Sequence, residues 1–167
     1  MSKYDLRFDL IDSPRQLRQL EGFMLAQVGA YDAGRHQAWV EDVCVPAVAS
    51  DERRALAWWS HGSMIGDAVL KPLTPDALEL KNFRIAQGRQ GRYLGAVMMV
   101  HVVLEGRDLL LEKGLASPDA NSFTVQLDTG AHLESYFAHH GFKTVERAEL
   151  YTPGREEVIM QRTVPLH

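Results

Sequence analysis

A glycine-rich stretch near the middle of the chain has the composition of an anion-binding turn. Gly88, Gly91 and Gly95 follow one another closely, and Arg89 and Arg92 lie between them. Glycine lets the backbone approach a phosphate oxygen, and the first N–H groups of a helix have no intrahelical acceptor and attract anions. The arginines would add charge-assisted donors. On spacing alone, a solvated turn between a strand and a helix explains these residues nearly as well.

Two common phosphate-binding motifs fit this stretch poorly. A Walker loop ends in Gly-Lys-Ser or Gly-Lys-Thr, whereas Gly95 is followed by Ala96-Val97. A dinucleotide fingerprint follows the first strand of a parallel βαβ unit, whereas this loop follows a predicted antiparallel run in mid-chain. The anion is therefore not identified by either motif.

Several side chains could transfer protons. Glu79 alternates with Lys81 on the strand predicted before the loop, and Asp128 ends a later predicted strand. Each also has a structural interpretation: Glu79 as a solvent-facing carboxylate paired with Lys81 or Lys71, and Asp128 as a helix cap or Asx turn. For Asp128 the structural interpretation is the stronger one.

Metal binding and nucleophilic catalysis have little support. The seven histidines are scattered, Cys44 is the single cysteine, and the Gly-x-Ser-x-Gly motif is absent. We expect Cys44 to be a buried structural thiol on the apolar face of a helix. No metal ligands are predicted.

The N-terminal half is predicted to place one strand and two helices before three strands. Leu6–Leu10 alternates like a strand, and Ser13-Pro14 is typical of a helix start. The second helix should carry Trp39, Val43 and Ala47 on one face and be kinked or ended by Pro46. The expected elements are helices Arg15–Ala30 and His36–Ala49, then antiparallel strands Ala55–Ser60, Met64–Leu70 and Ala77–Ala86. On the last strand Leu78, Leu80 and Phe83 are expected to face one way, and Glu79 and Lys81 the other.

The C-terminal half is predicted to add two helices and three strands. A helix after Gly95 should bury a stripe of Val97, Val100, Val103 and Leu104, continued by Leu111. The remaining elements are strand Phe123–Asp128, helix Ala131–His140 ended by Gly141, and strands Phe142–Tyr151 and Glu156–Val164. The order β-α-α-β-β-β-α-β-α-β-β predicts an α/β chain of the α+β type, one domain spanning residues 1–167.

The bulk composition bounds the class of protein. A chain of 167 residues with 46% hydrophobic and 24% charged residues is typical of one globular domain. A net charge of -4 provides no basic field for nucleic acid, and no apolar run is long enough to span a membrane. A single cysteine and the lack of a signal-peptide pattern at Met1–Asp12 lead us to expect a cytoplasmic protein.

The loop and its flanks resemble one known family. The stretch from Phe83 to Gly95, and within it Ile85–Gly95 most specifically, is similar to the Q/R-x-x-G-x-G/A signature of the Gcn5-related N-acetyltransferases (GNAT). Tyr136-Phe-Ala-His-His-Gly-Phe142 is similar to the Y-x-x-x-G-F ending of that family. The order of elements also fits, so the resemblance extends over the whole chain. It implies a mixed, mostly antiparallel central sheet flanked by helices.

The resemblance implies acetyl-CoA as co-substrate. The backbone of Phe83, Arg84 and Ile85 would hydrogen-bond the pantetheine arm. A splay between this strand and Phe123–Asp128 would admit the molecule. The backbone amides of the loop would hold the pyrophosphate, provided that the Tyr93 side chain projects outward; they belong to Gln90, Gly91, Arg92, Tyr93, Leu94 and Gly95.

For catalysis the resemblance points to Glu79 and Tyr136. Glu79 lies on the strand where the family often carries its general base. Tyr136 is one residue from the position of the tyrosine that often protonates the departing thiolate, a position that Phe137 occupies here. Core packing is the alternative for Tyr136, which lies about 100° round the helix from that position. Tyr93 and Gly130 stand where the family usually has a glycine and an asparagine.

The expected function is transfer of an acetyl group from acetyl-CoA to the amine of a small molecule or peptide. Two alternatives stay open: a non-catalytic acyl-CoA-binding or sensor domain on the same fold, and a protein-interaction module whose glycine loop is structural. No nucleic-acid or membrane partner is expected, and a homodimer is compatible with such a fold.

Overall fold

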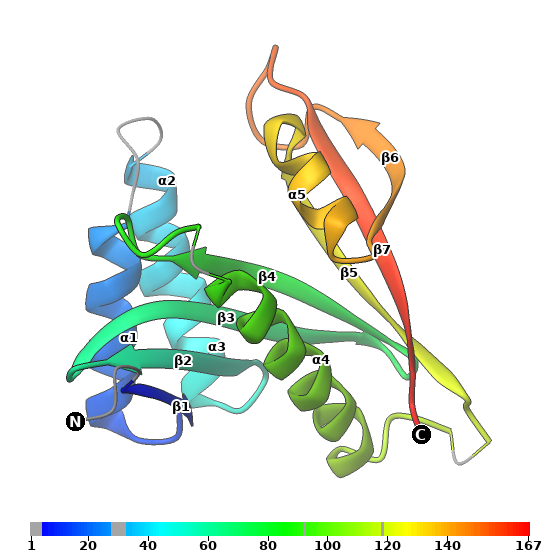
Figure 1. Ribbon diagram of the computed structural model, residues 1–167, viewed down its shortest axis with the longest axis horizontal. Coiled ribbons are helices and arrows are strands. Elements are labelled where there is room, and N and C mark those ends of the chain that lie inside the picture. The colour runs from blue at the N-terminus through cyan, green and yellow to red at the C-terminus, as the bar shows by residue number, and fades with distance from the viewer. Residues whose placement is uncertain (1–4, 28–32, 92, 118) are drawn as a thin grey trace. The chain divides into compact units, whose positions relative to one another are not determined.

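The structure, a computed structural model, describes residues 5–27, 33–91, 93–117 and 119–167 (Figure 1). Its strands form one seven-stranded sheet in the order β1-β2-β3-β4-β5-β7-β6. The strands are β1 (Leu6–Leu10), β2 (Arg54–Ser60), β3 (Ser63–Thr74), β4 (Ala77–Ile85), β5 (Ser122–Gly130), β6 (Lys143–Ala148) and β7 (Glu157–Pro165). The helices are α1 (Pro14–Ala26), α2 (Ala33–Ala38), α3 (Val45–Ala49), α4 (Leu94–Glu112) and α5 (Glu134–His139). A π-helical turn, Trp39–Cys44, joins α2 to α3, and a 3₁₀ turn, Ala131–Leu133, precedes α5.

The predicted fold class is confirmed, because a mixed sheet flanked by helices follows the predicted order of elements. β4 and β5 are parallel, whereas β1 with β2, β5 with β7, and β6 with β7 are antiparallel. The described residues form two compact units, Met1–Val69 with Asn82–Met98 and Leu70–Lys81 with Met99–His167. That the whole chain is one domain stays a prediction.

In the first unit, local sequence sets the start of α1. Ser13 is the N-cap and its hydroxyl accepts a hydrogen bond from the Gln16 N–H at 3.3 Å. Gln16 Oε1 in turn accepts from the Asp12 N–H at 3.2 Å, and Pro14 occupies the first helical position. These are the residue types that a helix start favours. Residues 28–30, the predicted end of this helix, lie outside the described residues.

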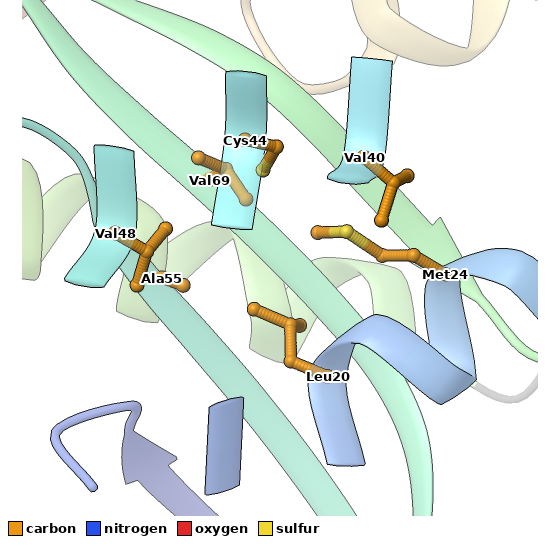
Figure 2. Close-up of a cluster of buried hydrophobic side chains, with 7 residues drawn as sticks. All are labelled: Leu20, Met24, Val40, Cys44, Val48, Ala55 and Val69. Carbon is orange, nitrogen blue, oxygen red and sulfur yellow. The ribbon is translucent and has the colours of Figure 1, made fainter. Parts of the chain in front are cut away.

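The core of the first unit lies between α1, the second helical segment and strands β2 and β3 (Figure 2). The sequence prediction for the second segment was wrong about Val43, which is 43% exposed, whereas Ala47 and Cys44 are buried as predicted and Val40 is buried with them. The segment contains a π-helical turn, in which the Val45 N–H bonds the Val40 carbonyl, five residues back. Pro46 does not end the segment, since it lies in the first turn of α3, where a missing N–H costs little. The core residues are Leu20, Met24, Val40, Cys44, Val48, Ala55 and Val69.

The second unit is organised around β5, which pairs with β4 on one side and β7 on the other. The parallel register with β4 covers Ala77–Glu79 against Thr124–Gln126, whereas the antiparallel register with β7 covers the whole of Ser122–Gly130. β6, at the edge of the sheet, has a register shift between Thr144 and Glu146 that leaves Val145 bulged and 54% exposed.

The predicted buried stripe of α4 is also wrong. Val97, Val100, Leu104 and Leu111 are exposed, whereas the buried apolar residues of the helix are Leu94, Met98, Met99, Val102, Leu109 and Leu110. The helix is apolar on most sides, so its periodicity offers two stripes. Gly106 decides between them, because a Cβ there would lie 2.7 Å from Leu78 Cδ1 on β4. A glycine at this point lets the helix come close to the sheet.

Candidate functional site

The glycine-rich loop of the first unit is held by its own backbone. After β4 the Ala86 N–H donates to the Ile65 carbonyl at 2.8 Å, and the Arg89 N–H donates to the Ala86 carbonyl at 3.0 Å. Gly88 and Gly91 have φ of 82° and 76°, which side chains other than hydrogen rarely allow. The Gln90 side-chain amide donates back to the Ile85 carbonyl at 3.3 Å. The loop is thus a sequence of tight turns that leads directly into α4.

Tyr93 forms the junction with the helix. Its carbonyl accepts from the N–H groups of Ala96 and Val97 at 3.1 and 3.2 Å, so α4 begins at Leu94, slightly earlier than predicted. Tyr93 adopts a left-handed φ of 59°, and its side chain is 88% exposed. The sequence analysis required the Tyr93 side chain to project outward so that the loop amides stay accessible. The exposed ring meets this requirement. Leu94 and Gly95 supply the first amides of a helix, where an anion is favoured. Arg92 lies outside the described residues.

The residues before the loop continue β4. Asn82, and not Phe83, is buried in step with Leu78 and Leu80, so the predicted placement of Phe83 is corrected: it shares a face with Glu79 and Lys81. The Arg84 guanidinium lies 3.4 Å from the Met24 carbonyl and 3.3 Å from His36 Nδ1, within the first unit.

A buried acid lies beside this strand and was not anticipated from the sequence. Asp67 on β3 is completely buried, and the Asn82 side-chain amide donates to its Oδ2. Asp67 Oδ1 has no hydrogen-bond partner among the described residues. Burial raises the pKa of Asp67 to about 7, against the opposing effects of the Asn82 hydrogen bond and the Arg84 charge. A lone aspartate inside a continuously buried strand segment gives no signal in the sequence of its polar partner on the neighbouring strand.

Cys44 is buried, as predicted, in the apolar cluster of the first unit. Burial raises the pKa of its thiol to about 11, so the thiol stays protonated near neutral pH. The interpretation as a structural thiol fits this environment.

The second unit gathers four polar side chains, defined here as the carboxylate cluster: Glu79, Lys81, Asp128 and Tyr151. Lys81 Nζ lies 3.0 Å from Glu79 Oε1 and 3.6 Å from Asp128 Oδ1. The Tyr151 hydroxyl donates to Asp128 Oδ2 at 2.7 Å. The cluster lies just past the last parallel register pair, Glu79 with Gln126, where side chains and not backbone bonds connect β4 and β5. The sequence analysis named both carboxylates as candidates. It also gave a Glu79–Lys81 ion pair as the structural alternative for Glu79, and this ion pair is observed.

Tyr151 is the member that the sequence did not reveal. The predicted strand Phe142–Tyr151 ends early, at Ala148, so Tyr151 falls in the connection to β7 and can turn toward Asp128. Burial, then the hydrogen bond and charge of Asp128, raise the pKa of Tyr151, so it stays a hydrogen-bond donor at neutral pH.

Tyr136, the other predicted catalytic residue, lies on α5 in a group of rings. Its ring centroid is 5.1 Å from that of Phe137 and 4.9 Å from that of His140. Its hydroxyl is buried and has no hydrogen-bond partner among the described residues, and burial raises its pKa. These contacts fit the alternative that Tyr136 packs in the core. A catalytic role for Tyr136 stays a prediction.

The described residues contain no group of three or more His, Cys, Asp or Glu side chains arranged to hold a metal ion. Across the same residues no helix has the length and apolarity needed to cross a membrane.

The described residues form a mixed α+β protein with a glycine-rich loop between β4 and α4 and, in the second unit, the carboxylate cluster. No family model matches the sequence, and no curated protein matches it as a relative. Solved structures do match. A putative GNAT acetyltransferase from Desulfovibrio desulfuricans superposes with a TM-score of 0.67 at 16% identity, over 97% of this chain and 99% of that one.

Two further matches carry the co-substrate. The PaiA N-acetyltransferase from Thermoplasma acidophilum, in complex with coenzyme A, has a TM-score of 0.63 at 15% identity, over 96% of this chain and 100% of that one. A GNAT acetyltransferase from Elizabethkingia anophelis with acetyl-CoA bound has a TM-score of 0.62 at 12% identity, over 97% and 100%. The chain therefore has the GNAT acetyltransferase fold, and the resemblance inferred from Ile85–Gly95 is confirmed at the level of the fold.

Proposed function

We propose that this chain is an acyl-CoA-dependent N-acyltransferase that moves an acetyl group from acetyl-CoA to the amine of a small molecule or peptide. The observation that carries the proposal is the loop from Gly88 to Gly95, whose left-handed residues lead into the first turn of α4. On a fold shared with coenzyme A-bound acetyltransferases, this is a suitable site for the pyrophosphate. The cytoplasm suits a chain with one buried cysteine.

The loop would hold the phosphates through backbone amides. The N–H groups of Gln90, Gly91, Tyr93, Leu94 and Gly95 are the described candidates, and the exposed Tyr93 ring leaves them accessible. Arg92, predicted beside them, would add charge. The backbone of Phe83, Arg84 and Ile85 would bind the pantetheine arm along the end of β4, as in an added strand.

Glu79 is the proposed general base. It lies on β4, four residues before Phe83, and its side chain, 13% exposed, pairs with Lys81 in the carboxylate cluster. An amine acceptor is mostly protonated at neutral pH, so a base must remove a proton before nitrogen attacks the thioester carbonyl. Lys81 pairs with that carboxylate and is itself held by a second ion pair with Asp128.

Binding and turnover test the proposal in sequence. Calorimetric titration with coenzyme A should give saturable binding, and release of thiol from acetyl-CoA should rise when amines are added. The panel of acceptors should include polyamines, aminoglycosides and peptide N-termini. Absence of binding at millimolar coenzyme A would remove the co-substrate from the proposal.

A second function, a non-catalytic acyl-CoA sensor, is favoured by one observation. Phe137 stands at the position of the usual proton-donating tyrosine, and its ring packs against Phe142 with a centroid separation of 5.9 Å. Tight binding of acetyl-CoA with no amine-dependent release of thiol would support the sensor over the enzyme.

A further inference from the structure

Tyr93 is the strained residue of the glycine-rich loop. Its backbone has a φ of 59°, in the left-handed region that a bulky side chain disfavours. Glycine adopts this conformation without strain, and Gly88 and Gly91 do so earlier in the same loop. The Tyr93 side chain is 88% exposed, so packing within the chain does little to offset the strain. A tyrosine held in this way points to a contact with a molecule outside the chain.

Tyr93 lies at the end of the loop where the nucleotide of a bound coenzyme A would emerge. The loop and residues 83–85 of β4 belong to the same unit. The pantetheine arm, bound along those residues, would lie on the strand side of the pyrophosphate. The adenosine is attached to the other end of the pyrophosphate, so it would leave the loop on the side of α4. Tyr93 is the residue at that junction, since its carbonyl accepts from the N–H groups of Ala96 and Val97.

An exposed phenol ring beside a phosphate site is suited to hold a purine base. Every base has a flat π-face, and stacking on an aromatic side chain stabilises binding without a closed pocket. Val97, in the first turn of α4, is 39% exposed and provides further apolar surface close to the loop in the same unit. The loop amides recognise only negative charge, whereas the Tyr93 ring can recognise the base that accompanies it.

We propose that Tyr93 is a specificity-determining residue, whose ring stacks on the adenine of coenzyme A. It would favour acyl donors that carry the nucleotide over acyl groups carried on phosphopantetheine alone. The inference rests on the proposed function, because it takes the pyrophosphate to be held by the amides of the same loop. A donor without adenosine leaves the ring in solvent and binds through its phosphate and pantetheine only. The strain at Tyr93 is then offset when the donor binds, and not in the free protein.

The test is calorimetric titration of coenzyme A into full-length variants at position 93. Tyr93→Phe keeps the ring and should bind coenzyme A as the wild type does. Tyr93→Leu keeps a bulky side chain on the same backbone but has no aromatic face, so its affinity should fall about 5-fold to 100-fold. The two variants should bind 4′-phosphopantetheine, which lacks adenosine, with equal affinity. Equal affinities of the two variants for coenzyme A, or an equal loss in Tyr93→Leu for both ligands, would overturn stacking.

Tyr93→Gly separates a role in binding from a role in folding. It relieves the backbone strain, so the midpoint of thermal unfolding should hold or rise, whereas affinity for coenzyme A should fall as in Tyr93→Leu. Asp51→Gly is the matched control, because Asp51 has a φ of 60° in the turn before β2, and this change should leave the affinity unaltered. Wild-type affinity in Tyr93→Gly would overturn the inference and leave the proposed function standing. If the wild type binds no coenzyme A, the proposed function itself fails.

Discussion

The glycine-rich loop and the carboxylate cluster show two ways of building a site on one strand. The loop depends on backbone conformation, with left-handed φ at Gly88, Gly91 and Tyr93, and it lies within a few consecutive residues. The cluster depends on side chains that come from β4, β5 and the connection before β7. A site made of consecutive backbone groups can be predicted from the local sequence. A cluster of side chains from separate elements forms only when the fold brings those elements together.

The largest effect should come from removing the proposed base. Glu79→Gln keeps the size of the side chain and removes its negative charge, so kcat/KM should fall about 100-fold to 10,000-fold. The dissociation constant of coenzyme A, measured by calorimetry, should not change, because the loop lies elsewhere. Glu146→Gln, on the exposed edge strand, is the matched control and should be silent. An equal loss of affinity and turnover in Glu79→Gln would mean that the cluster belongs to the binding site.

Asp67→Asn should remove a pH dependence of stability from the first unit. The folded pKa is raised from 3.8 to about 7, so the folded state keeps a proton that the unfolded chain releases between those values. The contribution of Asp67 to the free energy of unfolding is thus fully present below pH 4 and constant above pH 7. Between these values it falls by about 4 kcal/mol. Thermal unfolding at pH 8 should show a midpoint several degrees higher for the variant, and none of this gain at pH 4.

The control for that variant is Asp42→Asn, on an exposed helical face, which should not move the midpoint at either pH. Identical pH profiles for wild type and Asp67→Asn would show that folding does not raise the pKa of this carboxyl. Loss of coenzyme A affinity in Asp67→Asn would show that the first unit, too, uses a side chain for binding.

Gly91→Val and Gly62→Val form a matched pair that tests the backbone site. Both glycines have φ near 76°, both have open space around an added Cβ, and only Gly91 is in the loop. Each substitution should cost about 1–2 kcal/mol of stability through strain. Gly91→Val alone should weaken binding of coenzyme A, by about tenfold if that strain is relieved by moving the amides. Equal affinities of the two variants would remove the loop from the site.

The smallest effects should distinguish the two tyrosines. Tyr151→Phe removes the hydrogen bond to Asp128 and should lower kcat several-fold, since such a bond contributes about 1 kcal/mol. Tyr136→Phe removes a buried hydroxyl for which the described part of the chain offers no hydrogen-bond partner, so stability should hold or rise slightly. A fall in kcat for Tyr136→Phe with Tyr151→Phe unaffected would favour the role inferred from sequence, and the reverse would favour the cluster.

Much of the fold could be predicted because its signals are local. The alternation of Leu6–Leu10, the Ser13-Pro14 helix start and the glycine that ends a helix at Gly141 each act through neighbouring residues. The loop was predicted for the same reason. At Tyr93 the backbone is left-handed and the ring is exposed, so the turn before α4 forms there without a glycine.

The errors arise where distant residues decide. Val43 was expected to share a face with Trp39 and Ala47, but it is exposed, and Val40 and Cys44 are the residues of that segment that are completely buried in the core of the first unit. The buried face of α4 is selected by the close approach of Gly106 to Leu78, not by the helix alone. Tyr151 joins Asp128 because β6 ends early, and Asp67 finds Asn82 across strands.

The register shift in β6 has a consequence for solubility. An edge strand exposes unpaired backbone groups that can recruit a strand from another molecule and start aggregation. In β6 the bulge at Val145 interrupts the regular spacing of those groups, and Lys143, Glu146 and Arg147 place charges beside it. At the opposite edge β1 has only five residues. Within the described residues, the two edge strands β1 and β6 are thus poor templates for pairing with a strand of another molecule.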